Sequence, residues 1–203
     1  MDNDKRWAVL PVKPFDWAKS RLDGVLTAAE RAALARQLML GSLAALIESR
    51  CFVGVLVVSR DAEALALAEQ QGAQPLAEDA PANLNTAISA ARAVATRAGA
   101  ESLLVLASDL PLVRAEDILR VVAAAATATA VVVPDRRAEG TNALLLTPPD
   151  LIEPAFGLQS FARHLALLAD AGAVTTVLRL ERIAFDLDLP EDLAELEMRE
   201  GYL

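Results

Sequence analysis

Short apolar runs alternate with longer stretches in which apolar residues recur every three or four positions. The run over residues 103–107 is too short for a buried helix and is flanked by Gly99 and Pro111, which favours a strand, and the apolar run over 52–59 is also expected to be a strand. The spacing between Thr27 and Glu30 is that of a capping box and predicts a helix reaching about residue 49. Regular alternation of strand and helix predicts a mainly parallel sheet with right-handed crossovers.

The same pattern predicts the other elements. Strands are expected over residues 7–12, 52–59, 73–77, 103–107, 130–134, 143–146 and 174–180, and helices over 27–49, 61–72, 83–98, 115–126, 160–171 and from 191 onward. With 203 residues, of which 54% are hydrophobic, the chain can bury one substantial core, so we expect one domain over residues 1–203. The fold class is therefore α/β, with three layers and a Rossmann-like, mainly parallel central sheet.

Charge and composition limit the classes of binding partner and the cellular location that we expect. The net charge of −9 argues against a nucleic-acid partner, which would need a basic face. No apolar stretch approaches the roughly 20 residues of a membrane span, and the polar amino terminus lacks a signal-peptide core, so we expect a cytoplasmic protein without a membrane partner. The single cysteine, Cys51, allows neither an intrachain disulfide nor a thiolate zinc cluster. Helical surfaces rich in alanine and leucine would tolerate a homodimer.

The apolar run at 103–107 ends on Ser108 and Asp109. The carboxyl edge of an open α/β sheet is where ligands bind, so an ionised Asp109 there is a candidate Mg²⁺ ligand and Ser108 a candidate nucleotide-binding residue. The alternative is that Asp109 only caps the next helix.

Three cations follow the first strand on this acidic chain: Lys13, Lys19 and Arg21. Lysine offers point charges and arginine a planar fork, so we predict a cradle for nucleotide phosphates with a catalytic role. No glycine-rich phosphate loop stands here to do the same with backbone amides. A solvated charged loop is the alternative.

A second acidic pair, Asp186 and Asp188, also lies between an apolar run and a helix. Together with Asp109 it predicts a Mg²⁺ site, because this ion takes one or two carboxylates plus phosphate oxygens. A metal beside a cationic loop suits nucleotidyl transfer from a triphosphate. No conventional catalytic base is evident, which suits a phosphate acceptor because it is already ionised near neutral pH.

Compact polar residues also occur at two further junctions between predicted strands and helices or loops. Asn85 could hydrogen-bond a nucleobase edge, although capping of the following helix by Asn83 or Asn85 is the alternative. Thr141 and Asn142 follow Gly140 and precede an apolar strand, where they are candidates for substrate binding or simply a turn.

Gly157 and Ser160 precede a predicted helix whose free amides could bind a phosphate or carboxylate. His164, the chain's single histidine, lies four residues after Ser160 on the same helix face. We expect His164 to be a structural hydrogen-bonding residue rather than a catalyst.

Taken together, these segments resemble the 2-phospho-L-lactate or phosphoenolpyruvate guanylyltransferase family of deazaflavin coenzyme F(420) biosynthesis. The resemblance spans nearly the whole chain and rests on PVKPFDWAKSRL, Glu30–Arg31, Leu84–Asn85, SDLPL, GTNALLL, FGLQSFARH and DLDLPEDL in that order. It implies a nucleotide-diphospho-sugar transferase-like fold, and it implies that GTP reacts with a small phosphorylated three-carbon acid to release pyrophosphate.

The resemblance also implies residue roles. Lys13, Lys19 and Arg21 would hold the GTP phosphates, and Asp109 with Asp188 would bind Mg²⁺. Thr141, Gly157 and Ser160 fall where similar enzymes bind phosphoenolpyruvate. The segment LQS after Gly157 departs from the small or proline residues expected there, which bears on the shape of the acceptor pocket.

The leading hypothesis is guanylyl transfer to phosphoenolpyruvate or 2-phospho-L-lactate. The alternatives are the same chemistry on 3-phospho-D-glycerate, another nucleotidyltransferase acting on a sugar phosphate or a molybdenum cofactor, and a nucleotide-binding module without turnover. A metal-dependent glycosyltransferase fits less well, because the DLD sequence lies close to the carboxyl terminus.

Overall fold

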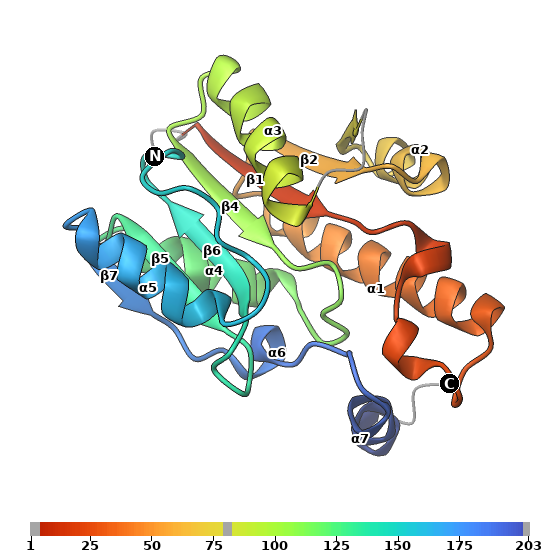
Figure 1. The fold of residues 1–203 in the computed structure, drawn as a ribbon. Coiled ribbons are helices and arrows are strands. Elements are labelled where there is room, and N and C mark those ends of the chain that lie inside the picture. The colour runs from red at the N-terminus through yellow and green to blue at the C-terminus, as the bar shows by residue number, and fades with distance from the viewer. Residues whose placement is uncertain (1–4, 79–82, 201–203) are drawn as a thin grey trace.

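A seven-stranded mixed sheet forms the centre of the protein (Figure 1). The computed structural model describes residues 5–78 and 83–200, so most of the polar amino terminus considered above lies outside the described part. In spatial order the strands are β3 (Gln74–Ala77), β2 (Gly54–Ser59), β1 (Arg6–Pro11), β4 (Ser102–Leu106), β6 (Thr141–Leu146), β5 (Ala130–Pro134) and β7 (Thr175–Val177).

Strand β6 runs antiparallel to both of its neighbours, β4 and β5, and the other pairings are parallel. Leu106 at the end of β4 therefore pairs with Ala143, and the Ala107 amide donates to the Asn142 carbonyl at 2.8 Å. This reversal brings the first residues of β6 to the sheet edge where β1 and β4 end. That edge is the one that ligands use in open α/β sheets.

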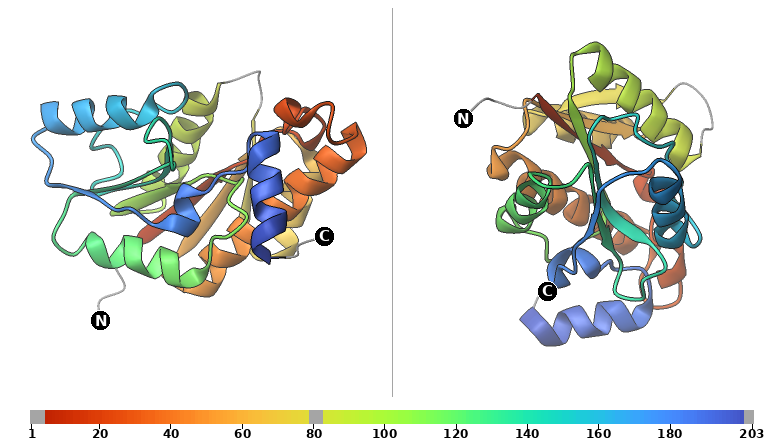
Figure 2. Two further views of the ribbon diagram at one scale, coloured as in Figure 1. Left: turned by 90° about the horizontal axis from the view of Figure 1, so that it is seen from below. Right: turned by 90° about the vertical axis from the view of Figure 1, so that its left-hand side faces the viewer.

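Helices cover both faces of the sheet and make three layers (Figures 1 and 2). One face carries α1 (Ala28–Ser49), α2 (Ala62–Gln70), α4 (Ala115–Ala124) and the short α6 (Glu181–Ala184), and the other carries α3 (Leu84–Arg97) and α5 (Ser160–Asp170). Two 3₁₀ turns, η1 (Phe15–Trp17) and η2 (Ser20–Leu22), follow β1, and α7 (Pro190–Glu200) packs beside η2 and α1.

The central strand β4 shows why the layers form. Leu103 and Val105 face α3, whereas Leu104 and Leu106 face α1 and α4, and all four are almost fully buried. A strand buried on both faces reads as a continuous apolar run, which is the pattern the sequence has there. The three-layer, mainly parallel prediction is confirmed.

Two of the predicted strands have different bounds in the structure. The strand expected over residues 174–180 stops at Val177, and the unpredicted α6 follows it. The strand expected at 143–146 begins at Thr141, because the antiparallel ladder pairs Thr141 with Pro134.

Among the described residues, no helix combines the length and apolar character that a membrane span requires.

Candidate active site

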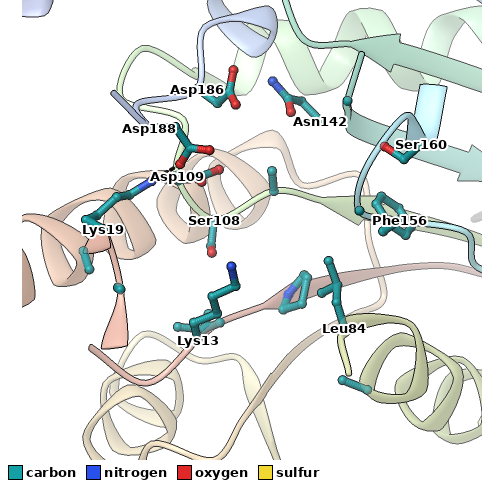
Figure 3. Close-up of a pocket in the computed structure, with 18 of the residues that line it drawn as sticks. Lys13, Lys19, Leu84, Ser108, Asp109, Asn142, Phe156, Ser160, Asp186 and Asp188 are labelled. Atoms are coloured by element: carbon teal, nitrogen blue, oxygen red, sulfur yellow. Dashed lines mark hydrogen bonds and ion pairs between the residues drawn. The ribbon is translucent and has the colours of Figure 1, made fainter. Parts of the chain in front are cut away.

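A cavity of about 750 Å³ opens at the sheet edge where β1 and β4 end and β6 begins (Figure 3). Nearly all residues that the sequence analysis singled out line it: Lys13, Lys19, Arg21, Ser108, Asp109, Thr141, Asn142, Gly157, Ser160, Asp186 and Asp188. They come from segments far apart in the sequence. One predicted residue, Asn85, is not among those lining it.

Lys19 joins the two acidic segments. Its ammonium donates to Asp109 Oδ2 at 2.9 Å and to Asp188 Oδ1 at 3.2 Å, and only 6% of its side chain is exposed. Burial lowers the pKa of Lys19, but the two carboxylates outweigh burial and raise the pKa above its ordinary value. Lys19 therefore stays charged, and Asp109 and Asp188 share a single cation.

The loop after β1 holds Lys19 in this place. Asp61, which caps α2, accepts a hydrogen bond from the Phe15 amide at 2.8 Å and so fixes η1. Lys19 has a left-handed backbone with φ of 54°, an unfavourable conformation for a residue with a Cβ. The strained backbone directs the ammonium back toward the end of β4.

The other two cations of the loop, Lys13 and Arg21, are more exposed to solvent than Lys19. Arg21 is largely exposed and lies 3.6 Å from Asp188 Oδ2. Lys13 is exposed and points toward Ser108 in Figure 3. Both can move toward a bound anion without leaving a buried partner.

Asp192 supports the loop that carries Asp188. Fully buried at the start of α7, it accepts hydrogen bonds from the amides of Asp188 and Leu189 at 2.9 and 2.7 Å. It also pairs with Arg136 and Arg137. Burial would raise the pKa of Asp192, but the two amides and two guanidiniums lower it overall, so this carboxylate stays ionised.

Asp186 differs from its acidic neighbours. Among the described residues no group hydrogen-bonds its buried Oδ1 atom. Burial, followed by the charge of Asp109, raises the pKa of Asp186 to about 6. An oxygen of this kind is free to bind a cation or a donor entering the cavity.

No group of three acidic, histidine or cysteine side chains in the described part of the chain is arranged to hold a metal ion. In this arrangement the position between Asp109 and Asp188 is taken by the Lys19 ammonium. A divalent cation could bind there only if Lys19 moved.

Thr141, Gly157 and Ser160 form the other end of the cavity. Thr141 is nearly buried, and its hydroxyl lies 2.9 Å from Nδ1 of His164. Gly157 has φ of 108°, which favours glycine and turns the chain into α5. Ser160 is the first residue of α5 and faces the cavity with Phe156 (Figure 3), so the positive end of a helix dipole lies at this wall.

Two predicted amides have structural partners. Asn85 Oδ1 accepts from the Phe156 amide at 2.7 Å and its Nδ2 donates to the Phe156 carbonyl at 3.1 Å, so both ends of the side chain face backbone rather than a nucleobase. Asn83 caps α3 instead. Asn142 lines the cavity, but its Nδ2 donates to the Ile183 carbonyl at 2.9 Å and fixes α6.

The sequence analysis missed several lining residues. Arg60 and Glu78 directly follow β2 and β3, and their side chains lie 3.7 Å apart. The rule that singled out Asp109 would have found both, because parallel strands end at one sheet edge. Trp17, largely exposed and stacked against Arg60, and Leu84 add apolar surface. No pattern in the sequence distinguishes these two.

Cations and carboxylates therefore line one part of the cavity, and hydrogen-bond donors at a helix start line another. Such an arrangement can bind a triphosphate, neutralise its charge and hold a second anion beside it. The described residues facing the cavity include no histidine, so proton abstraction by imidazole has no obvious place here.

Comparison with known proteins agrees with this chemistry. The family model "Guanylyl transferase CofC like" matches residues 6–201. A phosphoenolpyruvate guanylyltransferase from Conexibacter woesei is 40% identical over 192 residues, covering 94% of this chain and 86% of the relative. Another, from Sphaerobacter thermophilus, is 42% identical over 189 residues, covering 93% and 91%.

Solved structures support the fold alone. A protein from Desulfovibrio desulfuricans described as a nucleotide-diphospho-sugar transferase aligns with a TM-score of 0.78 at 16% identity, covering 98% of this chain and 90% of that one. The 4-diphosphocytidyl-2C-methyl-D-erythritol synthase of Anaerococcus prevotii aligns with a TM-score of 0.66 at 10% identity, covering 99% and 100%. Since the family model spans nearly the whole chain, this protein belongs to the CofC-like guanylyl transferase family.

Proposed function

We propose that this protein transfers the guanylyl group of GTP to the phosphate of phosphoenolpyruvate, in coenzyme F(420) biosynthesis. The observation that carries the proposal is that Asp109, Asp188 and Lys19 meet in a cavity whose far wall offers Thr141 and the start of α5. Relatives that bear the name phosphoenolpyruvate guanylyltransferase align over almost the full chain and support the choice of acceptor.

In the proposed reaction, a phosphate oxygen of the acid attacks the α-phosphorus of GTP. The new P–O bond forms as the bond from the α-phosphorus to the bridging oxygen breaks, and pyrophosphate leaves with that oxygen. The acceptor is already ionised near neutral pH, so no side chain need remove a proton. Lys13, Lys19 and Arg21 bind the triphosphate and offset the charge of two anions held together.

We assign Mg²⁺ to Asp109 and Asp188 with Asp186 as a further ligand, in an arrangement that differs from the present one because Lys19 must first leave the two carboxylates. Two carboxylates that already share one ammonium form a place that accepts positive charge, and Asp186 Oδ1 is a buried oxygen that no described group hydrogen-bonds. When bound, Mg²⁺ would neutralise phosphate charge. Lys19 would then release the carboxylates and turn its ammonium toward the phosphates.

The acid would lie against Thr141, Gly157 and Ser160. A hydroxyl and the first turn of a helix are suited to a carboxylate or phosphate. Ser108, two residues after β4, lies beside Lys13 in Figure 3 and would contact the nucleotide. In this proposal these residues would hold the acceptor beside the α-phosphate rather than beside the base.

The test is a panel of acceptors with GTP and Mg²⁺, followed by pyrophosphate release and the mass of the product. The account predicts product with phosphoenolpyruvate in preference to 2-phospho-L-lactate and 3-phospho-D-glycerate. Pyrophosphate release with CTP or with a sugar phosphate, and none with GTP and these acids, would contradict the proposal. GTP binding without turnover on any acceptor would favour the binding-module alternative.

A further inference from the structure

We propose that His164 is a positioning residue that fixes the hydroxyl of Thr141 as a hydrogen-bond donor toward an oxyanion of the acid substrate. The identity of that ligand rests on the proposed function, whereas the state of the imidazole does not. His164 is fully buried on α5 and acts through Thr141, which lines the cavity.

Three contacts hold the imidazole in one orientation. Nδ1 lies 2.9 Å from Thr141 Oγ1, and Nε2 accepts a hydrogen bond from the Ala155 amide at 3.2 Å. The ring packs edge-on against Phe156, with centroids 4.7 Å apart and planes at 71°. Both ring nitrogens thus have a partner, and the ring cannot flip without losing both hydrogen bonds.

The Ala155 contact decides the tautomer. A backbone N–H can only donate, so Nε2 must present a lone pair, and the single proton of the neutral imidazole must be on Nδ1. Nδ1–H then donates to Thr141 Oγ1. Because that oxygen accepts from His164, the hydroxyl hydrogen of Thr141 is left to donate elsewhere, and the cavity is the polar space this residue lines.

The neutral form is stable in these surroundings. Burial, and then the positive charge of Arg163, lower the pKa of His164 to about 4. Protonation would also place a hydrogen on Nε2 against the Ala155 amide. The tautomer and the direction of the Thr141 hydroxyl therefore hold near neutral pH, where the phosphate acceptor is ionised.

A hydroxyl fixed as a donor selects among ligands. It stabilises a carboxylate or phosphate oxygen, which accepts the hydroxyl hydrogen that His164 leaves free. The start of α5 at Ser160 adds a positive helix dipole at the same wall. His164 thereby links the wall formed by β6 to the segment that carries Phe156 and Gly157.

The tautomer is measurable directly, since the chain contains a single histidine. A long-range ¹H–¹⁵N spectrum of tag-free, ligand-free protein should show one imidazole with a pyrrole-type Nδ1 and a pyridine-type Nε2, unchanged from pH 6 to 8. A proton on Nε2, or an imidazole that titrates near its ordinary pKa, would overturn the proposal without reference to activity.

Paired variants test the link to the substrate. In His164→Asn the amide nitrogen lies near the position of Nδ1 and keeps the donor to Thr141, whereas His164→Gln places its amide near Nε2 and removes that donor. We expect His164→Gln to raise KM for phosphoenolpyruvate about tenfold, the effect of one hydrogen bond, while KM for GTP stays within about twofold. His164→Asn should stay close to the wild type.

When Thr141→Val is also present, His164→Gln and His164→Asn should no longer differ in KM for phosphoenolpyruvate. Persistence of that difference, or an equal rise in both KM values, would overturn the role of His164 in positioning Thr141. If wild-type protein makes no product from GTP and phosphoenolpyruvate, the proposed function fails, and the imidazole spectrum still decides the tautomer.

Discussion

The ammonium of Lys19 lies 2.9 Å from a carboxylate oxygen of Asp109, although the two residues are 90 positions apart in the sequence. The same ammonium contacts Asp188, which comes from a third segment near the carboxyl terminus. The ammonium of Lys19 thus joins three chain segments: its own loop, the loop of Asp109 and the loop of Asp188. Any cation or phosphate that enters must compete with, or rearrange, this ion-paired group.

Lys19→Met should weaken GTP binding by about 10- to 100-fold, because a desolvated charge-assisted contact contributes about 1.5–3 kcal/mol. Titration calorimetry of GTP with Mg²⁺ measures the change. Lys5→Met is the matched control, since Lys5 is an exposed lysine that precedes β1 at the opposite sheet edge. Unchanged affinity in Lys19→Met would show that this lysine serves only the two carboxylates.

Asp186→Asn should alter the pH dependence of stability in metal-free protein. The folded-state pKa of about 6 is above the ordinary value, so ionisation of Asp186 destabilises the fold as pH rises toward and through 6. The variant removes this cost. The difference in free energy of unfolding between variant and wild type should therefore be about 1–3 kcal/mol more favourable to the variant at pH 7.5 than at pH 4. Urea unfolding in chelator at both values measures the gain. An equal difference at the two values would contradict the assignment.

Asp192→Ala should loosen the loop that carries Asp188. The amides of Asp188 and Leu189 would lose their acceptor and Arg136 its buried partner. Each buried donor left without a partner costs about 1–3 kcal/mol, so the midpoint of thermal unfolding should fall. Glu191→Ala, at an exposed neighbouring position, is the control and should change little. Equal effects of both substitutions would rule out a supporting role for Asp192.

Asn85→Ala separates the predicted role of this residue from the observed one. Because Asn85 holds both backbone groups of Phe156, its loss should raise KM for the acid and leave GTP affinity nearly unchanged. Asn83→Ala removes the cap of α3 without touching Phe156 and serves as a control. A loss of GTP affinity specific to Asn85→Ala would instead restore the nucleotide role predicted from the sequence.

The sequence predicted the sheet and most of the cavity because both depend on local pattern. An apolar run ending on Asp109 already defines a buried strand and the edge at which it stops. Thr141 and Asn142 were placed just before a strand rather than in it, since the antiparallel register of β6 depends on its pairing with β4 and β5. The pairing of Lys19 with Asp109 depends on tertiary placement in the same way.

Other residues show where local pattern is insufficient. Asn85 has the chemistry of a base-reading amide, and only the position of Phe156 reveals that its hydrogen bonds are already made. Arg60 and Glu78 were within reach of the strand-end rule, which the sequence analysis did not apply to the runs at 52–59 and 73–77. His164 was expected to support the site, and the structure adds which atom it supports.

Asp109→Asn tests the central claim most directly, in a side-by-side assay with wild-type protein, GTP, Mg²⁺ and phosphoenolpyruvate. The account predicts that wild type releases pyrophosphate and forms a guanosine diphosphate-linked acid of the expected mass. It predicts that the variant loses turnover by at least about 100-fold, as when an electrostatic group at a reacting phosphate is removed, while metal-free GTP binding changes little. Turnover retained in the variant, or no product from the wild type, would contradict it.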